Sequence, residues 1–394
     1  MAITYFDSTM SGVHALTGTP GSLIAMLDDC LINGIGSVTV TPLVVASNIA
    51  TGTVSTGHGF AMIDGKVGPI IRVSGASPSG FNGDFRITSV PTSTTFTYAT
   101  TGVSDQTATG TISAKIAPIG WVKAHTGTNK AIYSRTEANT TAMVLRIDDS
   151  TATSATVRAY ESATGIDTTL TAPIPTEAQC TLANGRWYKS STSDSVARKW
   201  CLLSDGKRLV FLPMWHASTN WRDPYLFGDL ISNLTGDNYH FLFALSQGAS
   251  GNPGSYNATF VPWPSSTSYP PYLARTYAQI GSAVAAKCIA PRLEGTYMTG
   301  YVSASQNNIT FPDPITQGLL LRGNIEFAEV TANALRGRWP GMYAPIQSGA
   351  LTDGNVITGV TGAGSGTLLT MAIGSYAGNT SAEGRIYIDL LDWS

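Results

Sequence analysis

Residues 19–34 read TPGSLIAMLDDCLING, the one stretch of the chain with a clear helical pattern. Leu23, Leu27, Cys30 and Leu31 recur at helical spacing and form an apolar stripe. Almost everything that follows has the composition of β-strands and turns. The pattern therefore predicts one amphipathic helix near the N-terminus, ahead of a β-rich body.

Both ends of this helix carry suitable capping residues. Thr19 can act as the N-cap, Pro20 suits the first helical position, and Gly34 suits the left-handed C′ position. No second helix lies nearby in the sequence, so the stripe must pack on a sheet of its own chain or on a neighbouring subunit. Both alternatives stay open, and the three leucines are candidate interface residues at a junction between subunits.

The composition favours a mainly β fold in a permanent assembly. The 394 residues include 41 glycines and 20 prolines, which indicates many turns and short strands. Only 12% of residues are charged, against about 25% in ordinary globular proteins. Buried interfaces are depleted in charged residues, so we expect a homo-oligomer. The formal net charge is −2, and the sequence shows no cluster of basic residues that would bind nucleic acid or a membrane surface. We therefore expect neither partner.

We expect several small β-sandwich or barrel-like domains in addition to the helix. The Asn82-Gly83 and Asp205-Gly206 pairs predict hairpin turns. We expect an N-terminal arm with the amphipathic helix (residues 1–36), a small β module (37–117) and a second β domain (118–247). A linker (248–285) and a C-terminal β domain (286–394) are expected to follow. A short helix is expected near residues 276–286, at the end of the linker.

Cysteine usage and the chain start indicate synthesis in the cytoplasm. Cys30, Cys180, Cys201 and Cys288 include no C-x-x-C pair, so buried free thiols are expected. The first residues lack the pattern of a signal peptide, and no apolar run is long enough to span a bilayer.

No residue pattern indicates an enzyme, a metal site or a cofactor. The histidines His14, His58, His125, His216 and His240 are not spaced as metal ligands. The adjacent carboxylates Asp28-Asp29 and Asp148-Asp149 point in different directions on regular elements, so neither forms an acid–base pair. His58, within Gly-His-Gly, is expected to cap its own turn.

Two aromatic groups have competing interpretations. Trp215, Trp221 and Tyr225 could form a platform on which glycans stack, or they could belong to an aromatic core. A second group is rich in the residue types that dominate interface hot spots, so it could anchor an interface with another protein. Alternatively, it could form a structural corner within the chain. Its members are Arg336, Arg338, Trp339 and Tyr343.

Residues 37–117 resemble a small β module that recurs in tail and virion proteins of bacteriophages. The matching stretches are Gly57–Phe60, Ile71–Gly75, Phe81–Phe85 and Thr94–Tyr98. More broadly, the chain resembles virion structural proteins of tailed phages that infect Gram-negative bacteria. The stretches behind that likeness are Tyr5–Gly12, Asp29–Leu31, Phe227–Asp229 and Leu335–Tyr343.

The resemblance implies a structural subunit of a phage virion, in the tail or baseplate. Such a subunit is made in the host cytoplasm and acts by binding its own copies and other virion proteins. The alternatives are a capsid decoration or collar protein and a receptor protein that binds host-surface glycans. The resemblance supplies no catalytic residue, and the sequence shows no long β-helix repeat of the kind a polysaccharide hydrolase would favour.

Overall fold

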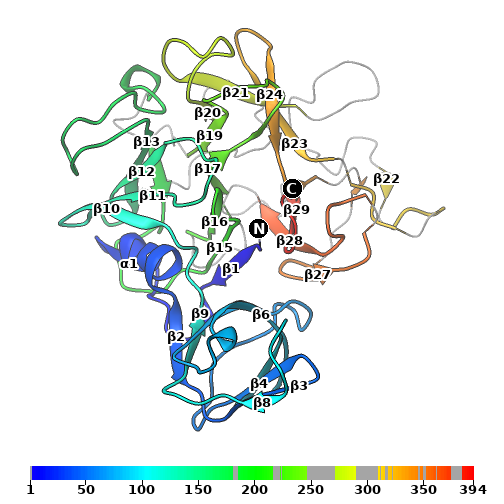
Figure 1. Ribbon diagram of the computed structural model, residues 1–394. Helices are drawn as coiled ribbons and strands as arrows, with labels where there is room; N and C mark the ends of the chain where they lie inside the picture. The colour runs from blue at the N-terminus through cyan, green and yellow to red at the C-terminus, as the bar shows by residue number, and fades with distance from the viewer. Residues whose placement is uncertain are drawn as a thin grey trace.

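The computed structural model describes residues 2–180, 185–215, 222, 224–245, 271–289, 309–310, 312–315, 318–321, 323–344, 347–348, 352–360, 362–373 and 384–394. These residues form several curled β-sheets and one α-helix near the N-terminus (Figure 1). The predicted class, mainly β with sandwich- or barrel-like units and one N-terminal helix, is confirmed. Within the same residues, no helix has the length and apolar character needed to cross a membrane.

A ten-stranded antiparallel sheet forms the centre of the body. Its strands, in spatial order, are β1 (Thr4–Asp7), β15 (Trp200–Ser204), β16 (Arg208–Pro213), β17 (Tyr225–Asp229), β19 (Phe241–Ala244), β20 (Tyr272–Leu273), β21 (Val284–Ile289), β23 (Ile325–Glu329), β24 (Leu335–Trp339) and β18 (Ile231–Ser232). The Asp205-Gly206 turn joins β15 to β16, as predicted. The N-terminal segment is part of this sheet through β1 and is not a separate arm.

The middle strands of the central sheet are buried on both faces. Along β16, Leu209 and Phe211 belong to one hydrophobic cluster, whereas Val210 and Leu212 belong to a second. Successive side chains of a strand point to opposite faces, so the two clusters lie on the two sides of the sheet. Burial on both sides explains why this strand is apolar without alternation.

The central sheet closes on itself. Only Leu230 separates β17 from β18, and β18 pairs with β24 at the far edge of the sheet. The strands from β17 through β24 therefore form a barrel-like ring, because the chain that leaves β17 returns to the last strand. Leu226, Leu242 and Phe327 of these strands belong to the second hydrophobic cluster.

A five-stranded sheet and the helix cover the first face of the central sheet. The strands are β10 (Val122–Gly127), β11 (Lys130–Ser134), β12 (Val144–Asp148), β13 (Ser154–Tyr160) and β14 (Arg186–Tyr188). Trp187 stacks on Tyr225 of the central sheet, with ring centroids 5.3 Å apart. A short 3₁₀ turn, η3 (Glu177–Gln179), lies before β14.

A smaller C-terminal sheet covers the second face. Its order is β25 (Met342–Tyr343), β29 (Gly384–Asp389), β28 (Leu368–Ile373) and β27 (Val356–Ile357). Met371, Ile386 and Ile388 join the second hydrophobic cluster. Two short strands, β22 (Ile309–Thr310) and β26 (Gln347–Ser348), pair in parallel nearby.

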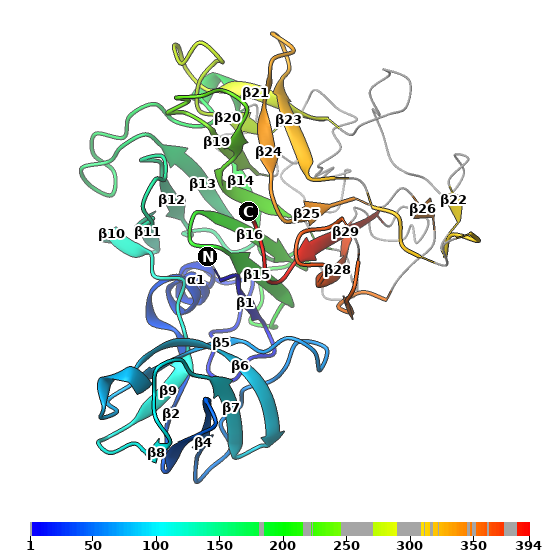
Figure 2. The same ribbon diagram turned by 45° about the vertical axis from the view of Figure 1, so that its right-hand side comes forward.

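An eight-stranded curled sheet forms a separate lobe at one end of the molecule (Figures 1 and 2). We call this lobe the module. Its strands, in spatial order, are β2 (Ile35–Thr39), β9 (Ser113–Ile116), β5 (Ile70–Ser74), β6 (Gly83–Thr92), β7 (Thr95–Ala99), β4 (Ile49–Thr53), β3 (Leu43–Ala46) and β8 (Gln106–Thr107). It is thus built entirely from residues 35–116.

The helix is shorter and more irregular than the capping pattern predicts. It consists of α1 (Ser22–Asp28) followed by a π-helical turn, η1 (Asp29–Asn33). Gly21 takes the left-handed conformation before the helix, so Thr19 is not the N-cap and Pro20 lies outside. Gly34 has φ +70°, and its N–H donates to Asp29 O at 2.8 Å. Because this bond joins residues five apart rather than four, the last turn is wider than an α-helical turn.

Three other local predictions need correction. The Asn82-Gly83 pair is not a two-residue hairpin turn, because η2 (Ser79–Phe81) lies in a longer connection between β5 and β6. The Asn82 side chain instead closes that connection through Ala76 N and O. The region near 276–286 is a turn followed by β21 and not a helix.

The central sheet crosses the predicted boundaries of the second and third β domains. It contains β19 from the predicted 118–247 domain, β20 and the start of β21 from the predicted linker, and β23 and β24 from the predicted C-terminal domain. Most of that linker, residues 248–270, lies outside the described residues. Sequence composition could not reveal this, because pairing between distant strands leaves no local signal.

Candidate functional site

The leucine stripe of the helix lies in the core of its own chain. Leu23, Leu27 and Leu31 are completely buried and belong to the cluster on the first face of the central sheet. The hypothesis that they lie at a subunit junction is therefore corrected. The sheets of the same chain cover the stripe and leave no exposed part of it for a partner.

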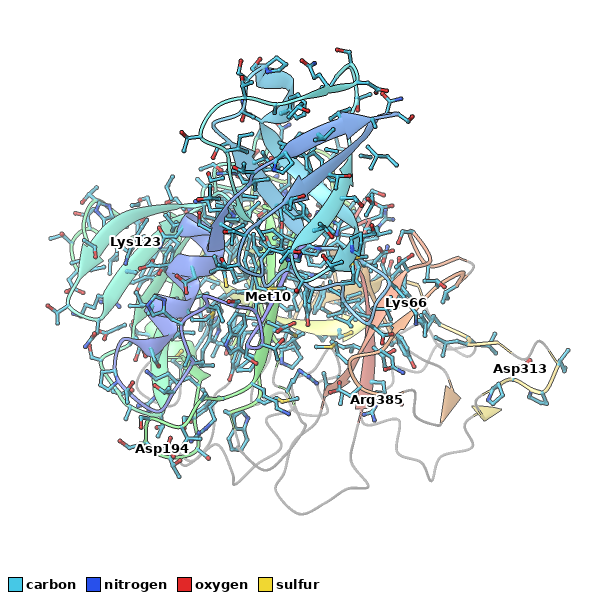
Figure 3. All side chains as sticks on the ribbon, turned by 90° about the horizontal axis from the view of Figure 1, so that it is seen from below. Met10, Lys66, Lys123, Asp194, Asp313 and Arg385 are labelled. Atoms are coloured by element: carbon cyan, nitrogen blue, oxygen red, sulfur yellow. The ribbon has the colours of Figure 1, made fainter. Side chains whose placement is uncertain are left out.

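Polar groups fix the helix at both ends. The Asp149 carboxylate accepts the Leu23 N–H at 2.8 Å and forms a fully buried ion pair with Lys189. Burial raises the pKa of Asp149 to about 6, although Lys189 acts in the opposite direction. Asp28 accepts Tyr133 OH at 2.8 Å and pairs with Lys123, which reaches the helix from β10 (Figure 3). Asp28 and Asp149 therefore each connect the helix to the five-stranded sheet or its neighbouring segments.

The proposed glycan platform is a core feature where the structure describes it. Trp215 is 6% exposed and Tyr225 only 1%, so neither ring offers a stacking face. Tyr225 OH also accepts the Tyr188 N–H at 2.9 Å inside the fold. Trp221 lies outside the described residues. The core interpretation therefore applies to Trp215 and Tyr225.

The arginine–aromatic group near β24 is also mainly internal. Arg336, Trp339 and Tyr343 are buried, so the prediction that they anchor an interface is corrected in favour of the structural corner. Arg338 is exposed, and so is Leu335 at the start of the same strand. Of the predicted group, only Arg338 is therefore exposed on β24, next to Leu335, which the prediction did not include.

Arg336 braces one end of the barrel-like ring. Its guanidinium pairs with Asp237 at 3.0 Å and with Glu329 at 2.9 Å. It also donates to the carbonyl of Arg275 at 2.6 Å and to that of Tyr239 at 3.3 Å. One buried cation thus holds three connections of the ring together. These contacts are structural, because each polar group is directed at another part of the same chain.

A second buried network joins the central sheet to the five-stranded sheet. Asp229 pairs with Arg135 at 2.7 Å and accepts the Thr141 N–H at 2.8 Å and Oγ1–H at 2.6 Å. Arg208 donates to the Asp229 carbonyl at 2.5 Å and pairs with Asp205 at 2.6 Å. These charges fix the packing of two layers on each other.

His58 caps its own turn, as the sequence indicated. The ring is buried between Phe60 and Phe96, and its Nδ1 accepts the Phe60 N–H at 2.9 Å. Nε2 faces the carbonyls of Thr92 and Thr95 at 3.1 and 3.2 Å. This arrangement requires the proton on Nε2, since Nδ1 is an acceptor.

All four cysteines are free thiols. Cys30, Cys180 and Cys201 are buried, whereas Cys288 is half-buried. Burial raises the pKa of the Cys201 thiol to about 12 and that of Cys30 well above its ordinary value. Thiols of this kind are inert at neutral pH, because the reactive species is the thiolate.

The charged side chains of the module are engaged within the molecule. Arg72 forms a bidentate pair with Asp84 at 2.7 and 2.8 Å, and Asp105 accepts the Ser47 N–H at 2.8 Å. The others contact the rest of the chain: Arg86 reaches Ile3 O, Lys115 reaches Asn33 O, and Asp64 and Lys66 reach Val356 (Figure 3). Many of the exposed residues of the module are threonines and serines.

Three uncharged turns meet at one end of the body. They are residues 233–236, 276–282 and 331–335. The Gln279 side chain ties the second turn to the first through Gly236 O at 3.1 Å and Asn238 N at 3.1 Å. Pairing of β21 with β23 brings the second and third turns to the same end of the ring.

These turns expose four large apolar side chains. The exposed fractions are 42% for Leu234, 55% for Tyr277, 66% for Ile280 and 45% for Leu335. The β18–β24 pairing continues through the Asn233 N–H bond to Arg336 O, which brings the first turn beside the start of β24, where Leu335 lies. We call these four residues the apolar end. These four residues were not among the predicted sites, although isolated large apolar residues in charge-free turns are visible in the sequence.

The described residues contain no group of three or more His, Cys, Asp or Glu side chains arranged to hold a metal ion. Their buried charges form pairs and hydrogen bonds within the fold, and the apolar end offers surface rather than reactive groups. The chemistry available at this end is contact with another apolar surface. Comparison with protein-family models and with curated proteins gives no match for this chain.

Proposed function

We propose that the protein is a structural subunit of a bacteriophage virion that acts through protein–protein assembly, most simply in the tail or baseplate. The observation that carries the assembly role is the apolar end, where three adjoining turns expose apolar side chains and contain no charge. Exposed clusters of this kind are typical of protein-interaction sites.

The distribution of charge supports the same role. The chain has few charged residues, and many of those described are buried in its interior. The outer surface therefore contains few charges, as the composition indicates. A surface of this kind suits a subunit that spends its working life in contact with other proteins, since interface cores are depleted in Lys, Glu and Asp.

The phage setting rests on the sequence resemblance of residues 37–117 and of the stretches around it. The comparisons with known proteins add nothing to it. A capsid decoration or collar protein would use the same type of surface, so it is an alternative position for the same role. For the receptor alternative, the described members of the aromatic group give no support, because both are buried.

Purified particles provide the test of this function. The phage that encodes the chain would be banded on a density gradient, and the band analysed by mass spectrometry. We expect the protein at a fixed ratio to the other particle proteins, including after a high-salt wash that removes adsorbed material. Absence from washed particles would contradict a virion role, whereas the copy number and the subassembly that retains it distinguish tail from capsid.

A further inference from the structure

We infer that the apolar end is a self-association surface, through which two copies of this chain pair about a two-fold axis. The inference rests on the proposed assembly function and names the partner that this surface takes. It is carried by four properties of the apolar end: its apolar character, its lack of charge, its rigid support and its position on the molecule.

The lack of charge is what a two-fold contact requires. In such an interface the same patch is used by both subunits, so each residue near the axis meets a copy of itself or of its neighbour. A charge placed there would face a like charge. The three turns contain none, and Leu234, Tyr277, Ile280 and Leu335 would meet other apolar groups.

Charges at the border of the apolar end already have partners within the chain. Arg275 forms a bidentate pair with Glu161 at 2.6 and 2.7 Å, and its guanidinium lies 4.3 Å from the centre of the Tyr239 ring. Lys287 donates to the Asn333 side chain. These groups can therefore form a polar rim without facing an uncompensated charge on the second copy.

Buried ion pairs and hydrogen bonds inside the ring hold the three turns in place. Asp237, next to the first turn, pairs with Arg336, and Arg336 also holds the carbonyl of Arg275 just before the second turn. The third turn joins β23 and β24, which carry Glu329 and Arg336 of the same network. A preorganised surface loses little conformational freedom on binding, which favours association.

The position of the apolar end favours a two-fold contact over a head-to-tail one. The β23–β24 turn lies at the end of the body farthest from the module in both ribbon views (Figures 1 and 2). A head-to-tail contact along the axis that joins these two ends would place the apolar end on the hydroxyl-rich module. Within residues 37–117, Ile49 is the one large apolar side chain that is exposed. The better apolar match for this surface is therefore the same surface on another copy.

Solution mass of the full-length chain tests the inference. We expect the wild-type protein to be a dimer, and Ile280→Asp to weaken dimerisation at least about tenfold, as the loss of an interface anchor would. Ile49→Asp is the matched control, because this residue is similarly exposed but lies in the module. It should remain dimeric. Circular dichroism should show the same folded signal for all three proteins.

A charge-swap experiment distinguishes pairing of identical surfaces from any other contact. Ile280→Lys and Ile280→Asp should each be monomeric alone, and an equimolar mixture should recover the dimer, since opposite charges then meet across the axis. A monomeric wild type, a dimeric Ile280→Asp, loss of the dimer in Ile49→Asp, or no recovery in the mixture would each overturn the inference. Open-ended oligomers that grow with concentration would also overturn it. None of these outcomes alters the particle test, so the two proposals can fail separately.

Discussion

Arg336 and Asp237 form a buried ion pair, with 3.0 Å between Nη2 and Oδ2, although 99 residues separate them in the chain. The pair lies where the barrel-like ring closes and directly supports the turn that carries Leu234. The same guanidinium pairs with Glu329 of β23. The closure of the sheet and the shape of the apolar end therefore depend on one side chain.

Replacement of Arg336 by alanine should destabilise the protein strongly. The change leaves Asp237 and Glu329 as uncompensated buried carboxylates, and breaking a buried pair typically costs about 3–5 kcal/mol. Urea denaturation measures the free energy of unfolding. Arg338→Ala is the control, because this neighbouring arginine is exposed, and surface changes usually stay within about 0.5 kcal/mol. Equal losses in the two variants would show that Arg336 does not brace the ring.

Leu27→Asp should unfold the chain rather than only disrupt assembly. Leu27 is fully buried in the core between the helix and the sheets, and an unpaired charge placed there costs several kcal/mol. Circular dichroism and amide exchange report the fold, and Leu27→Met, which conserves volume, should lose less than about 1.5 kcal/mol. A stably folded Leu27→Asp monomer would restore the interface interpretation of the helix.

Acid should release the contact between the module and the C-terminal sheet. The Val356 N–H bond, followed by that of Lys66, holds the pKa of Asp64 below its ordinary value of 3.8. A carboxylate whose pKa is lower in the folded state contributes stability above the unfolded value, and that contribution is lost as the pH falls through the folded value. Amide exchange at Val356 should therefore accelerate relative to the module core below about pH 4.

Asp64→Asn is the control for this acid effect. The amide removes the titrating group, so the difference in exchange between Val356 and the module core should no longer change with pH in that range. The same acid-dependent difference in both proteins would mean that another carboxylate governs the contact.

His58→Ala should weaken the module by roughly 1–3 kcal/mol, because the buried Phe60 N–H loses its acceptor. Asparagine offers an oxygen at a similar distance from the backbone, so His58→Asn should lose less. Thermal melts compare the two variants, and nitrogen chemical shifts of the His58 ring in the wild type should show the proton on Nε2. A proton on Nδ1 would contradict the proposed cap.

The sequence by itself determined the class of the fold and several local features. The spacing of Leu23, Leu27 and Leu31 predicts the helix, and the Asp205-Gly206 pair predicts a hairpin that the structure contains. The Gly-His-Gly turn around His58 was interpreted correctly as well. These features depend on residues close together in the chain, so composition and period are enough to identify them.

Tertiary structure alone decided what the distinctive side chains do. The leucine stripe, Trp339 and Arg336 have the composition of interface anchors, but strands from distant parts of the chain enclose them. The exposed residues at the apolar end lie in charge-free turns, but nothing in the local sequence shows that the three turns meet. Burial is set by which strands pair across long sequence separations, and the closing contact of β18 with β24 spans more than 100 residues. The physical reason is that a local pattern shows which side chains must be buried but not which part of the molecule buries them.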